Sequence, residues 1–379
     1  MSYLPVLLLG NGIRNNPALI EHLCSLQIPV LLTWPAMDFL DENDLVFCGR
    51  PGILGQRAAN IIQQKATHLY CFGARLDPEQ VFYDYERFAP NARKFVYDID
   101  KEEFKKFPPN GNGTDWHLST EVDSIIKAIG IPKSSAWLLW CKALYARFRP
   151  ELDGSADTKE FIDPFTFMRL LSDACKPDDV LATGSSGNAA TMFMQTFKVK
   201  KGQRVLNVSG IGAMGADIPM ALGAAIASKR RTICVTGDGG FQLNTQELET
   251  IRRERLPITF FVINNNGYAS IRSNQDLRFG GRRMGSDPKS GLTLPKLEEV
   301  VNAYGLMYHS LRGADLSPSL DLNKYMGSYP SIVEVFVDPD WVQYPRCMAE
   351  MRGTEFVRDD MSDMTPKIDD LKELMDWNG

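Results

Sequence analysis

Short apolar runs alternate with helix-length amphipathic stretches along the first part of the chain. Four apolar runs bounded by turn residues predict strands: Pro5–Leu9, Pro29–Thr33, His68–Phe72 and Lys94–Asp98. The stretches between and after them predict helices: Pro17–Ser25, Gln56–Gln64, Pro78–Phe88 and Thr120–Ile129. Pro17 and Pro78 suit a first helical turn, where a missing N–H group has no intrahelical partner to lose. This alternation is typical of a parallel sheet covered by helices.

The same alternation begins again after residues 130–163, which lack a steady period and predict a linker with one short helix near Trp137–Phe148. Further apolar runs predict strands: Val180–Thr183, Arg204–Val208, Thr232–Thr236, Ile258–Asn264 and Ile332–Asp338. Four stretches predict helices: Pro164–Cys175, Ile218–Ser228, Thr245–Arg255 and Leu294–Tyr304. Residues 270–291, rich in Gly, Arg, Ser and Asn, predict a mobile loop. We therefore predict an α/β protein with two doubly wound parallel-sheet domains, residues 1–132 and 161–379, joined by a linker at 133–160.

Composition and charge narrow the class of protein. The 379 residues suffice for two to three domains of about 150 residues each. The chain has 42 Lys and Arg against 47 Asp and Glu, a net charge of −5, so no nucleic-acid partner is expected. The early apolar run Leu4–Leu9 is too short for a membrane span. Seven scattered cysteines with no CxxC pair predict neither a disulfide framework nor a zinc knuckle, and a cytoplasmic location is expected.

Glycines and amides follow two predicted strands at their carboxyl ends. Gly-Asp-Gly-Gly at 237–240 comes directly after one strand, and Asn-Asn-Asn-Gly-Tyr at 264–268 ends the next. Backbone N–H groups of such a glycine turn can surround a phosphate. Neighbouring parallel strands would let Asp238 and Asn265 face one ion, and a carboxylate, an amide oxygen and a loop carbonyl suit magnesium. Each segment alone is better explained as an ordinary turn, but their joint spacing favours a site.

The two segments, with Asp238 preceding Asn265 by 27 residues, resemble the signature of thiamine diphosphate enzymes. Residues 237–268 are similar in particular to the acetolactate synthase-like and pyruvate decarboxylase-like branch of that family. The resemblance implies a magnesium ion held by Asp238, Asn265 and the carbonyl of Gly267. It also implies further cofactor contacts from the same two segments: Gly239, Gly240 and Tyr268.

Two more segments agree with this resemblance. Residues 210–215 resemble the family's turn in which a bulky side chain props the cofactor into a V shape. Met214 would be that prop, and the carbonyl of Gly212 would accept a hydrogen bond from the cofactor's 4′-amino group, so both would serve catalysis. Taken alone, Met214 would be explained by core packing. The segment at 183–188 would place three residues at the diphosphate, although an ordinary turn is the alternative: Ser185, Gly187 and Asn188.

The resemblance extends to both predicted domains. Residues 1–132 resemble the family's central Rossmann-like domain, and residues 161–379 its C-terminal domain, which binds diphosphate and magnesium. Residues 73–77 are similar to the segment that contacts flavin in acetolactate synthases. However, Gly-Asn-Gly at 10–12 lacks the third glycine of a dinucleotide fingerprint, because residue 15 is Asn. We therefore expect thiamine diphosphate and Mg²⁺ as cofactors. For the first domain we favour a scaffold role, with FAD binding as the alternative.

The family is normally built from three domains, and the resemblance covers the second and third. The remaining domain binds the pyrimidine ring and carries the glutamate that activates the cofactor, and no Glu of this chain can be assigned that role. Because the family's cofactor lies between domains of two chains, we expect a small partner subunit that supplies this domain, in an α2β2 heterotetramer. A chain truncated from a longer gene product is the alternative.

These resemblances imply the large subunit of a split carboligase or lyase acting on 2-keto acids or diketones, in the manner of acetolactate synthase. The alternatives are a split 2-keto acid decarboxylase that releases an aldehyde, and a non-catalytic regulatory chain that binds the cofactor. Four residues could shape substrate choice: Gln242, Tyr268, Arg272 and Gln275. Arg272 could hold a carboxylate through two hydrogen bonds, but we favour a solvated side chain. No membrane partner is expected.

Overall fold

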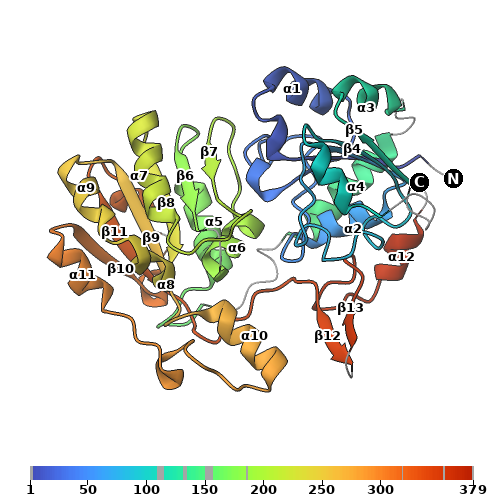
Figure 1. Ribbon diagram of the computed structural model, residues 1–379. Helices are drawn as coiled ribbons and strands as arrows, with labels where there is room; N and C mark the ends of the chain where they lie inside the picture. The colour runs from blue at the N-terminus through green and yellow to red at the C-terminus, as the bar shows by residue number, and fades with distance from the viewer. Residues whose placement is uncertain are drawn as a thin grey trace. The chain divides into compact units, whose positions relative to one another are not determined.

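The computed structural model describes residues 3–108, 115–130, 135–149, 157–184, 187–317, 319–352 and 355–377. Contacts divide the chain into two compact units (Figure 1). Unit 1 comprises Met1–Asp153 and Tyr344–Gly379, and unit 2 comprises Gly154–Gln343. Within the described ranges, no helix is long and apolar enough to cross a membrane.

Unit 1 is built on a five-stranded parallel sheet in the order β2-β1-β3-β4-β5. Its strands follow the predicted runs closely and add a fifth: β1 (Pro5–Leu9), β2 (Val30–Leu32), β3 (His68–Phe72), β4 (Arg93–Tyr97) and β5 (Asp115–Ser119). Its first four helices are α1 (Pro17–Ser25), α2 (Arg57–Lys65), α3 (Val122–Ala128) and α4 (Ser135–Arg147). The side chain of Asn16 accepts a hydrogen bond from the Leu19 amide at 3.1 Å, which fixes the start of α1. The prediction of a doubly wound α/β domain is confirmed.

Two details of unit 1 differ from the sequence prediction. Pro78–Phe88 forms turns instead of a helix, because Phe82 and Tyr83 adopt left-handed backbone conformations with φ of 54° and 58°. Asp77 and Asp84 accept hydrogen bonds from nearby backbone amides in this segment, and such bonds compete with helix formation. Helix α4, predicted inside a linker at 133–160, packs its Trp137, Cys141 and Leu144 into the core of unit 1. The boundary of the first unit therefore moves from residue 132 to residue 153.

The last part of the chain, residues 344–379, belongs to unit 1 rather than to the second domain predicted over 161–379. It contains the hairpin β12 (Ala349–Arg352) and β13 (Glu355–Arg358) and helix α12 (Leu371–Asp376). Helix α2 holds this tail with its polar side chains. Arg57 donates to the carbonyls of Met364 and Pro366 at 3.1 and 2.6 Å, and Lys65 donates to the carbonyl of Met375 at 2.6 Å. Every residue of α2 is buried, its apolar residues in the core of unit 1.

Lys94 in β4 is a fully buried cation of unit 1. Its ammonium donates to the carbonyl of Ala92 at 3.1 Å and lies 5.2 Å from the centre of the Trp116 ring. Burial lowers the pKa of Lys94 to about 8, against the opposing influence of Cys71 and Asp115. Between this value and the ordinary 10.5, the folded protein has released the proton while the unfolded chain keeps it. The contribution of Lys94 to the free energy of unfolding should therefore increase as the pH rises across that window. It should be lost as the pH falls through 8.

We expect Lys94→Met to stabilise unit 1 at pH 7 by about 1–3 kcal/mol, because it removes a buried charge. The advantage should shrink steadily between pH 8 and pH 10.5. Urea denaturation followed by tryptophan fluorescence at several pH values measures this difference. Lys127→Met, at an exposed position of α3, is the matched control and should show no such trend. A difference between Lys94→Met and the parent protein that stayed constant with pH would contradict the explanation.

Unit 2 contains a six-stranded parallel sheet in the order β10-β11-β9-β8-β6-β7. The strands are β6 (Val180–Thr183), β7 (Arg204–Leu206), β8 (Thr232–Gly237), β9 (Ile258–Asn264), β10 (Met307–Leu311) and β11 (Ser331–Phe336). The helices are α5 (Pro164–Ala174), α6 (Gly187–Thr196), α7 (Asp217–Ser228), α8 (Asp238–Phe241), α9 (Glu247–Arg253), α10 (Ala269–Phe279) and α11 (Leu297–Ala303). Helices cover the sheet on both faces, with α7 and α9 together on one side and α5 and α6 together on the other (Figure 1). This arrangement explains why β8 and β9 are buried along almost their whole length, without alternation between buried and exposed residues.

The prediction of a loop over residues 270–291 is wrong for the first half of that range. Helix α10 covers Ala269–Phe279 although its sequence is mostly polar. The helix is held by Arg272, whose buried side chain donates to four backbone carbonyls, and by Gln275, which bonds to the Met284 backbone. Tertiary hydrogen bonds thus replace the apolar face on which the prediction relied.

Candidate functional site

A cavity of about 240 Å³ lies in unit 2 at the carboxyl ends of β6 and β8, next to the loop that follows β9. Four chain segments that the sequence singled out line it together. The residues named beforehand that line it are Gly187, Asn188, Gly212, Met214, Asp238, Gly239, Gly240, Asn265, Gly267 and Tyr268. Ser185, predicted to join them, lies outside the described residues. Asp217, Ala189 and Ser270 also line the cavity and were not predicted.

Asp238 connects the two signature loops directly. Strands β8 and β9 are hydrogen-bonded neighbours in which Gly237 pairs with Ile263, so their carboxyl ends lie side by side as expected. One carboxylate oxygen of Asp238 accepts from the amide of Gly239 at 2.8 Å, and the other accepts from the amide of Gly267 at 2.9 Å. Burial raises the pKa of Asp238 to about 6, while these amides and the charge of Arg272 oppose the rise.

Asn265 presents an oxygen without a partner. Its side chain is 7% exposed, and its amide oxygen is buried without a hydrogen bond. Leaving a buried polar atom unpaired costs about 1–3 kcal/mol, so such an atom calls for a specific explanation. A cation beside the Asp238 carboxylate would satisfy it. In the described part of the chain no three His, Cys, Asp or Glu residues group together as metal ligands. The donors that are present therefore suit a hard cation completed by phosphate oxygens and water.

The turn that carries Asn265 has an unusual backbone and is tightly held. Asn266 has a φ of 58° and Gly267 a φ of 127°, both in the left-handed region. A Cβ atom on Gly267 would lie 2.6 Å from the carbonyl oxygen of Ser286, so glycine is required there. Arg272 donates to the carbonyls of Asn265 and Asn266 at 2.7 and 3.1 Å.

Arg272 is therefore neither the solvated side chain that we favoured nor a substrate clamp. It is 3% exposed, and its other hydrogen bonds go to the carbonyls of Ser286 and Pro339. The sequence held no clear signal of this role, because the four carbonyls that it binds come together only in the folded chain. Gln275, also considered for substrate choice, is bonded to Met284 and Ser286 and does not line the cavity.

Tyr268, Gly239 and Met214 form one wall of the cavity. A Cβ on Gly239 would lie 2.3 Å from the Tyr268 ring and 3.6 Å from the Met214 methyl group, so the ring covers the glycine closely. Met214 is 39% exposed, which excludes the alternative that it is core filler. The turn before α7 is anchored by Asn244, whose side chain donates to the carbonyl of Gly215 at 2.8 Å.

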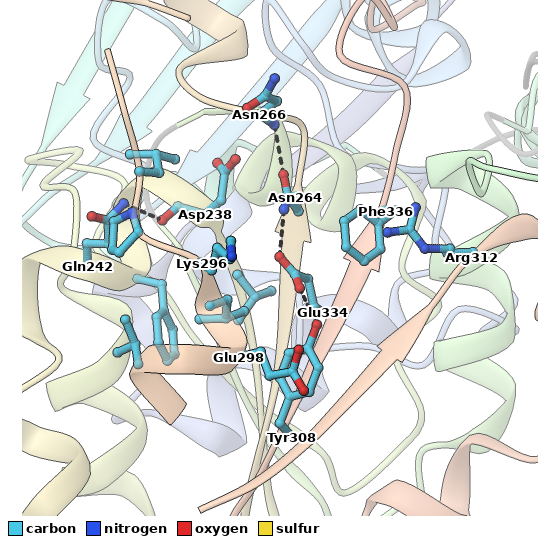
Figure 2. A pocket seen from close by; sticks show the side chains of 16 residues that line it. Asp238, Gln242, Asn264, Asn266, Lys296, Glu298, Tyr308, Arg312, Glu334 and Phe336 are labelled. Carbon is cyan, nitrogen blue, oxygen red and sulfur yellow. Dashed lines mark hydrogen bonds between the residues drawn. The ribbon is translucent and has the colours of Figure 1, made fainter. Parts of the chain in front are cut away.

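A second cavity of about 380 Å³ shares Asp238 with the first (Figure 2). It lies over the ends of β9 and β11 and beside the start of α11, and Gln242 lines it. Its charged side chains besides Asp238 come from three further segments: Lys296, Glu298, Arg312 and Glu334. The guanidinium carbon of Arg312 lies 3.5 Å from the centre of the Phe336 ring. In Figure 2, a line of hydrogen bonds runs from Tyr308 through Glu334 and Asn264 to Asn266.

The glycine turn of unit 1 is explained by packing. A Cβ on Gly10 would lie 2.2 Å from the carbonyl oxygen of Gly73, and one on Gly12 would lie 2.9 Å from the Gly73 Cα. The amides of Gly10 and Gly12 donate to the carbonyls of Phe72 and Gly73. These glycines let two backbone segments approach closely.

Two family models match the chain. The model described as thiamine pyrophosphate enzyme, central domain, matches residues 2–128, and the one described as thiamine pyrophosphate enzyme, C-terminal TPP binding domain, matches residues 185–335. The first match covers the five strands of unit 1, and the second begins after β6 and spans the other strands of the unit 2 sheet as far as the penultimate residue of β11. The chain belongs to the thiamine pyrophosphate enzyme family, as its signature residues indicated.

Within this family the chain is similar to acetolactate synthase large subunits. It is 25% identical over 361 residues to the isozyme 1 large subunit of Escherichia coli K12, covering 93% of this chain and 62% of that protein. It is 29% identical over 283 residues to the isozyme 2 large subunit of the same organism, covering 73% and 50%. It is 26% identical over 390 residues to a probable acetolactate synthase large subunit of Methanocaldococcus jannaschii, covering 98% and 64%. The chain thus spans between half and two thirds of the length of these relatives.

Proposed function

We propose that this chain is the large subunit of a thiamine diphosphate-dependent carboligase or lyase, acetolactate synthase-like, that acts on 2-keto acids or diketones. The observation that carries the proposal is the buried, unpartnered amide oxygen of Asn265 beside the Asp238 carboxylate, in a cavity lined by the signature glycines. The similarity to acetolactate synthase large subunits supports the substrate class. The free state of all seven cysteines suits the reducing cytoplasm in which we place the enzyme.

Different residues of unit 2 would bind the metal ion, the diphosphate and the rings of the cofactor. Asp238, Asn265 and the carbonyl of Gly267 would hold Mg²⁺ against the diphosphate. The backbone amides after the ends of β6 and β8 would bind phosphate oxygens, with these residues in that role: Ser185, Gly187, Asn188 and Gly240. Gly239, whose amide already donates to Asp238, would contact the cofactor through its uncovered backbone. Met214 and Tyr268 would shape the space for the thiazolium ring, and the carbonyl of Gly212 would orient the 4′-amino group.

When bound, thiamine diphosphate would supply a nucleophilic carbon and an electron sink for chemistry on a 2-keto acid. The chain contributes orientation and exclusion of water. Of the described residues that line the cavity, none is a glutamate. We therefore propose that a glutamate of a pyrimidine-binding domain completes the site and moves the proton at the pyrimidine ring, and that a small partner subunit in an α2β2 heterotetramer carries it. FAD has no part in this proposal.

The test mixes the purified chain with the product of a neighbouring gene that encodes such a domain. Pyruvate consumption, carbon dioxide release and the organic products are then measured with Mg²⁺ and thiamine diphosphate present. We expect the mixture to form a carbon–carbon bond, and the chain alone to be at least about 100-fold slower because it lacks general acid–base catalysis. Aldehyde as the sole product would favour the decarboxylase. An inactive mixture that still binds the cofactor would favour a regulatory chain.

A further inference from the structure

The amide of Asn264 lies between the metal-binding turn and the second cavity. Its oxygen accepts a hydrogen bond from the backbone amide of Asn266 at 2.9 Å, and its nitrogen donates to one carboxylate oxygen of Glu334 at 2.6 Å. The hydroxyl of Tyr308 donates to the other carboxylate oxygen at 2.5 Å. Figure 2 shows these side chains in one continuous line from β10 through β11 to β9. We call this line the Tyr308–Glu334–Asn264 relay.

Glu334 stands at an unexpected place for a carboxylate. It is 6% exposed and is flanked in β11 by Val333 and Val335, both fully buried. Burying a charged group is unfavourable unless its atoms form hydrogen bonds. Within the relay, both carboxylate oxygens of Glu334 accept hydrogen bonds. A leucine would fill the position without this cost. The carboxylate is therefore explained by what it does to Asn264 rather than by packing.

The relay decides which way the Asn264 amide faces. An ionised carboxylate accepts hydrogen bonds but cannot donate them, so the NH₂ group of Asn264 must face Glu334. The amide oxygen then necessarily faces the backbone of Asn266. With the amide reversed, its oxygen would meet the carboxylate and its NH₂ group would meet an N–H group. Tyr308 fixes Glu334 in turn by occupying its second oxygen.

The turn next to Asn264 needs such external support. Asn266 and Gly267 both have left-handed backbones, a conformation that few residues other than glycine and asparagine adopt. Arg272 restrains the carbonyls of Asn265 and Asn266, and the relay restrains the amide of Asn266. The orphan oxygen of Asn265 and the carbonyl of Gly267 belong to this turn.

We propose that Glu334, oriented by Tyr308, is a positioning residue for the magnesium site: through Asn264 it holds the 264–267 turn in the shape that presents the Asn265 oxygen and the Gly267 carbonyl to the ion. This inference rests on the proposed function, because it concerns the same metal site. Residues that orient metal ligands from outside typically change metal affinity about 10- to 100-fold when they are removed.

The experiment measures thiamine diphosphate binding by calorimetry over a series of Mg²⁺ concentrations, using the full chain with its partner subunit where one copurifies. For Glu334→Leu we expect the Mg²⁺ concentration at half-saturation to rise about 10- to 100-fold. In Glu334→Gln, the amide oxygen can still accept from Asn264 and the NH₂ group can donate to the Tyr308 hydroxyl, so this variant should stay within about threefold of the parent protein. At saturating Mg²⁺, each variant should bind thiamine diphosphate as the parent does.

Matched controls separate this role from a general loss of structure. Glu299→Leu removes an exposed carboxylate of α11 that pairs with Lys296, and Tyr329→Phe removes an exposed hydroxyl. Both should leave the Mg²⁺ requirement unchanged. Thermal melting without metal reports whether each variant is folded. If Glu334→Leu does not fold, Tyr308→Phe deletes a single hydroxyl of the relay and should shift the Mg²⁺ requirement in the same direction, by about 2- to 10-fold.

The outcomes distinguish this inference from the proposed function. If the parent protein shows no Mg²⁺-dependent binding of thiamine diphosphate, the proposed function fails, and this inference fails with it. If the parent protein binds but a folded Glu334→Leu or Tyr308→Phe variant has an unchanged Mg²⁺ requirement, the positioning role alone is overturned. A Glu334→Gln variant as weak as Glu334→Leu would also overturn it, because the hydrogen bonds would then be immaterial.

Discussion

Replacing Asp238 with alanine is expected to abolish Mg²⁺-dependent binding of thiamine diphosphate, with a loss of affinity of at least about 100-fold. The carboxylate is the anionic donor of the proposed metal site, and it also joins the two signature loops through the amides of Gly239 and Gly267. Its removal leaves both amides without partners and takes away the anionic donor of the site. Calorimetric titration of the chain with thiamine diphosphate and Mg²⁺ measures the loss.

Asp173→Ala, at an exposed position of α5, is the control and should bind thiamine diphosphate normally.

The parent protein should also show a characteristic pH dependence of Mg²⁺ binding. Because burial raises the pKa of Asp238 to about 6, the carboxyl group must release a proton to bind a cation below that pH. The Mg²⁺ concentration at half-saturation should be flat above pH 7 and rise about tenfold per unit below pH 6. Full binding by Asp238→Ala would contradict the assignment of the metal site.

The second large effect is expected in unit 1. Gly10→Ala would place a Cβ 2.2 Å from the Gly73 oxygen and 2.4 Å from the Ala74 Cα. These are backbone atoms of the segment that directly follows β3, so no side-chain rotation can relieve the clash. We expect a loss of about 3–5 kcal/mol in the free energy of unfolding, at the upper end for a single substitution. Urea denaturation followed by tryptophan fluorescence is a suitable measurement, because Trp341 alone among the six tryptophans belongs to unit 2.

Gly223→Ala is the contrasting control. Gly223 lies within α7, and a Cβ there would meet nothing within 4 Å. This substitution should stabilise its helix by up to about 1 kcal/mol, since alanine has the higher helix propensity. A Gly10→Ala protein with the parent's urea midpoint would show that the backbone around Gly73 yields more easily than its packing suggests.

The elements that could be predicted from the sequence are those with apolar strands between clear turn signals. The runs at β1, β3, β6 and β9 begin and end at the predicted residues, because a strand buried on both faces carries an uninterrupted apolar signal. The edge strands β5 and β10 were missed. Their residues alternate between buried and exposed or stay half-exposed, and they include charged and polar side chains such as Asp115 and Ser310.

The same distinction applies to the residues of the site, some of which follow apolar strands directly while others depend on contacts between distant segments. Asp238, Asn265 and Gly267 follow strands directly, so sheet topology alone brings them together. Helix α6 was missed because Gly187 and Asn188 at its start also suit a turn. Arg272 and Glu334 could not be placed from local pattern, because their partners come from distant segments. Glu334 did carry one signal, as the sole charged residue of the otherwise apolar and hydroxyl-bearing strand β11.

The hydrogen bonds between α2 and residues 344–379 have a consequence for how the chain folds during synthesis. Arg57 reaches the carbonyl of Met364, 307 residues further along, so unit 1 is interrupted in sequence by the whole of unit 2. A ribosome must complete unit 2 before it makes the segment that covers the polar side of α2. We therefore expect unit 2 to reach its native fold first on the growing chain. Unit 1 would remain incomplete, with α2 uncovered, until the residues beyond 344 have been synthesised.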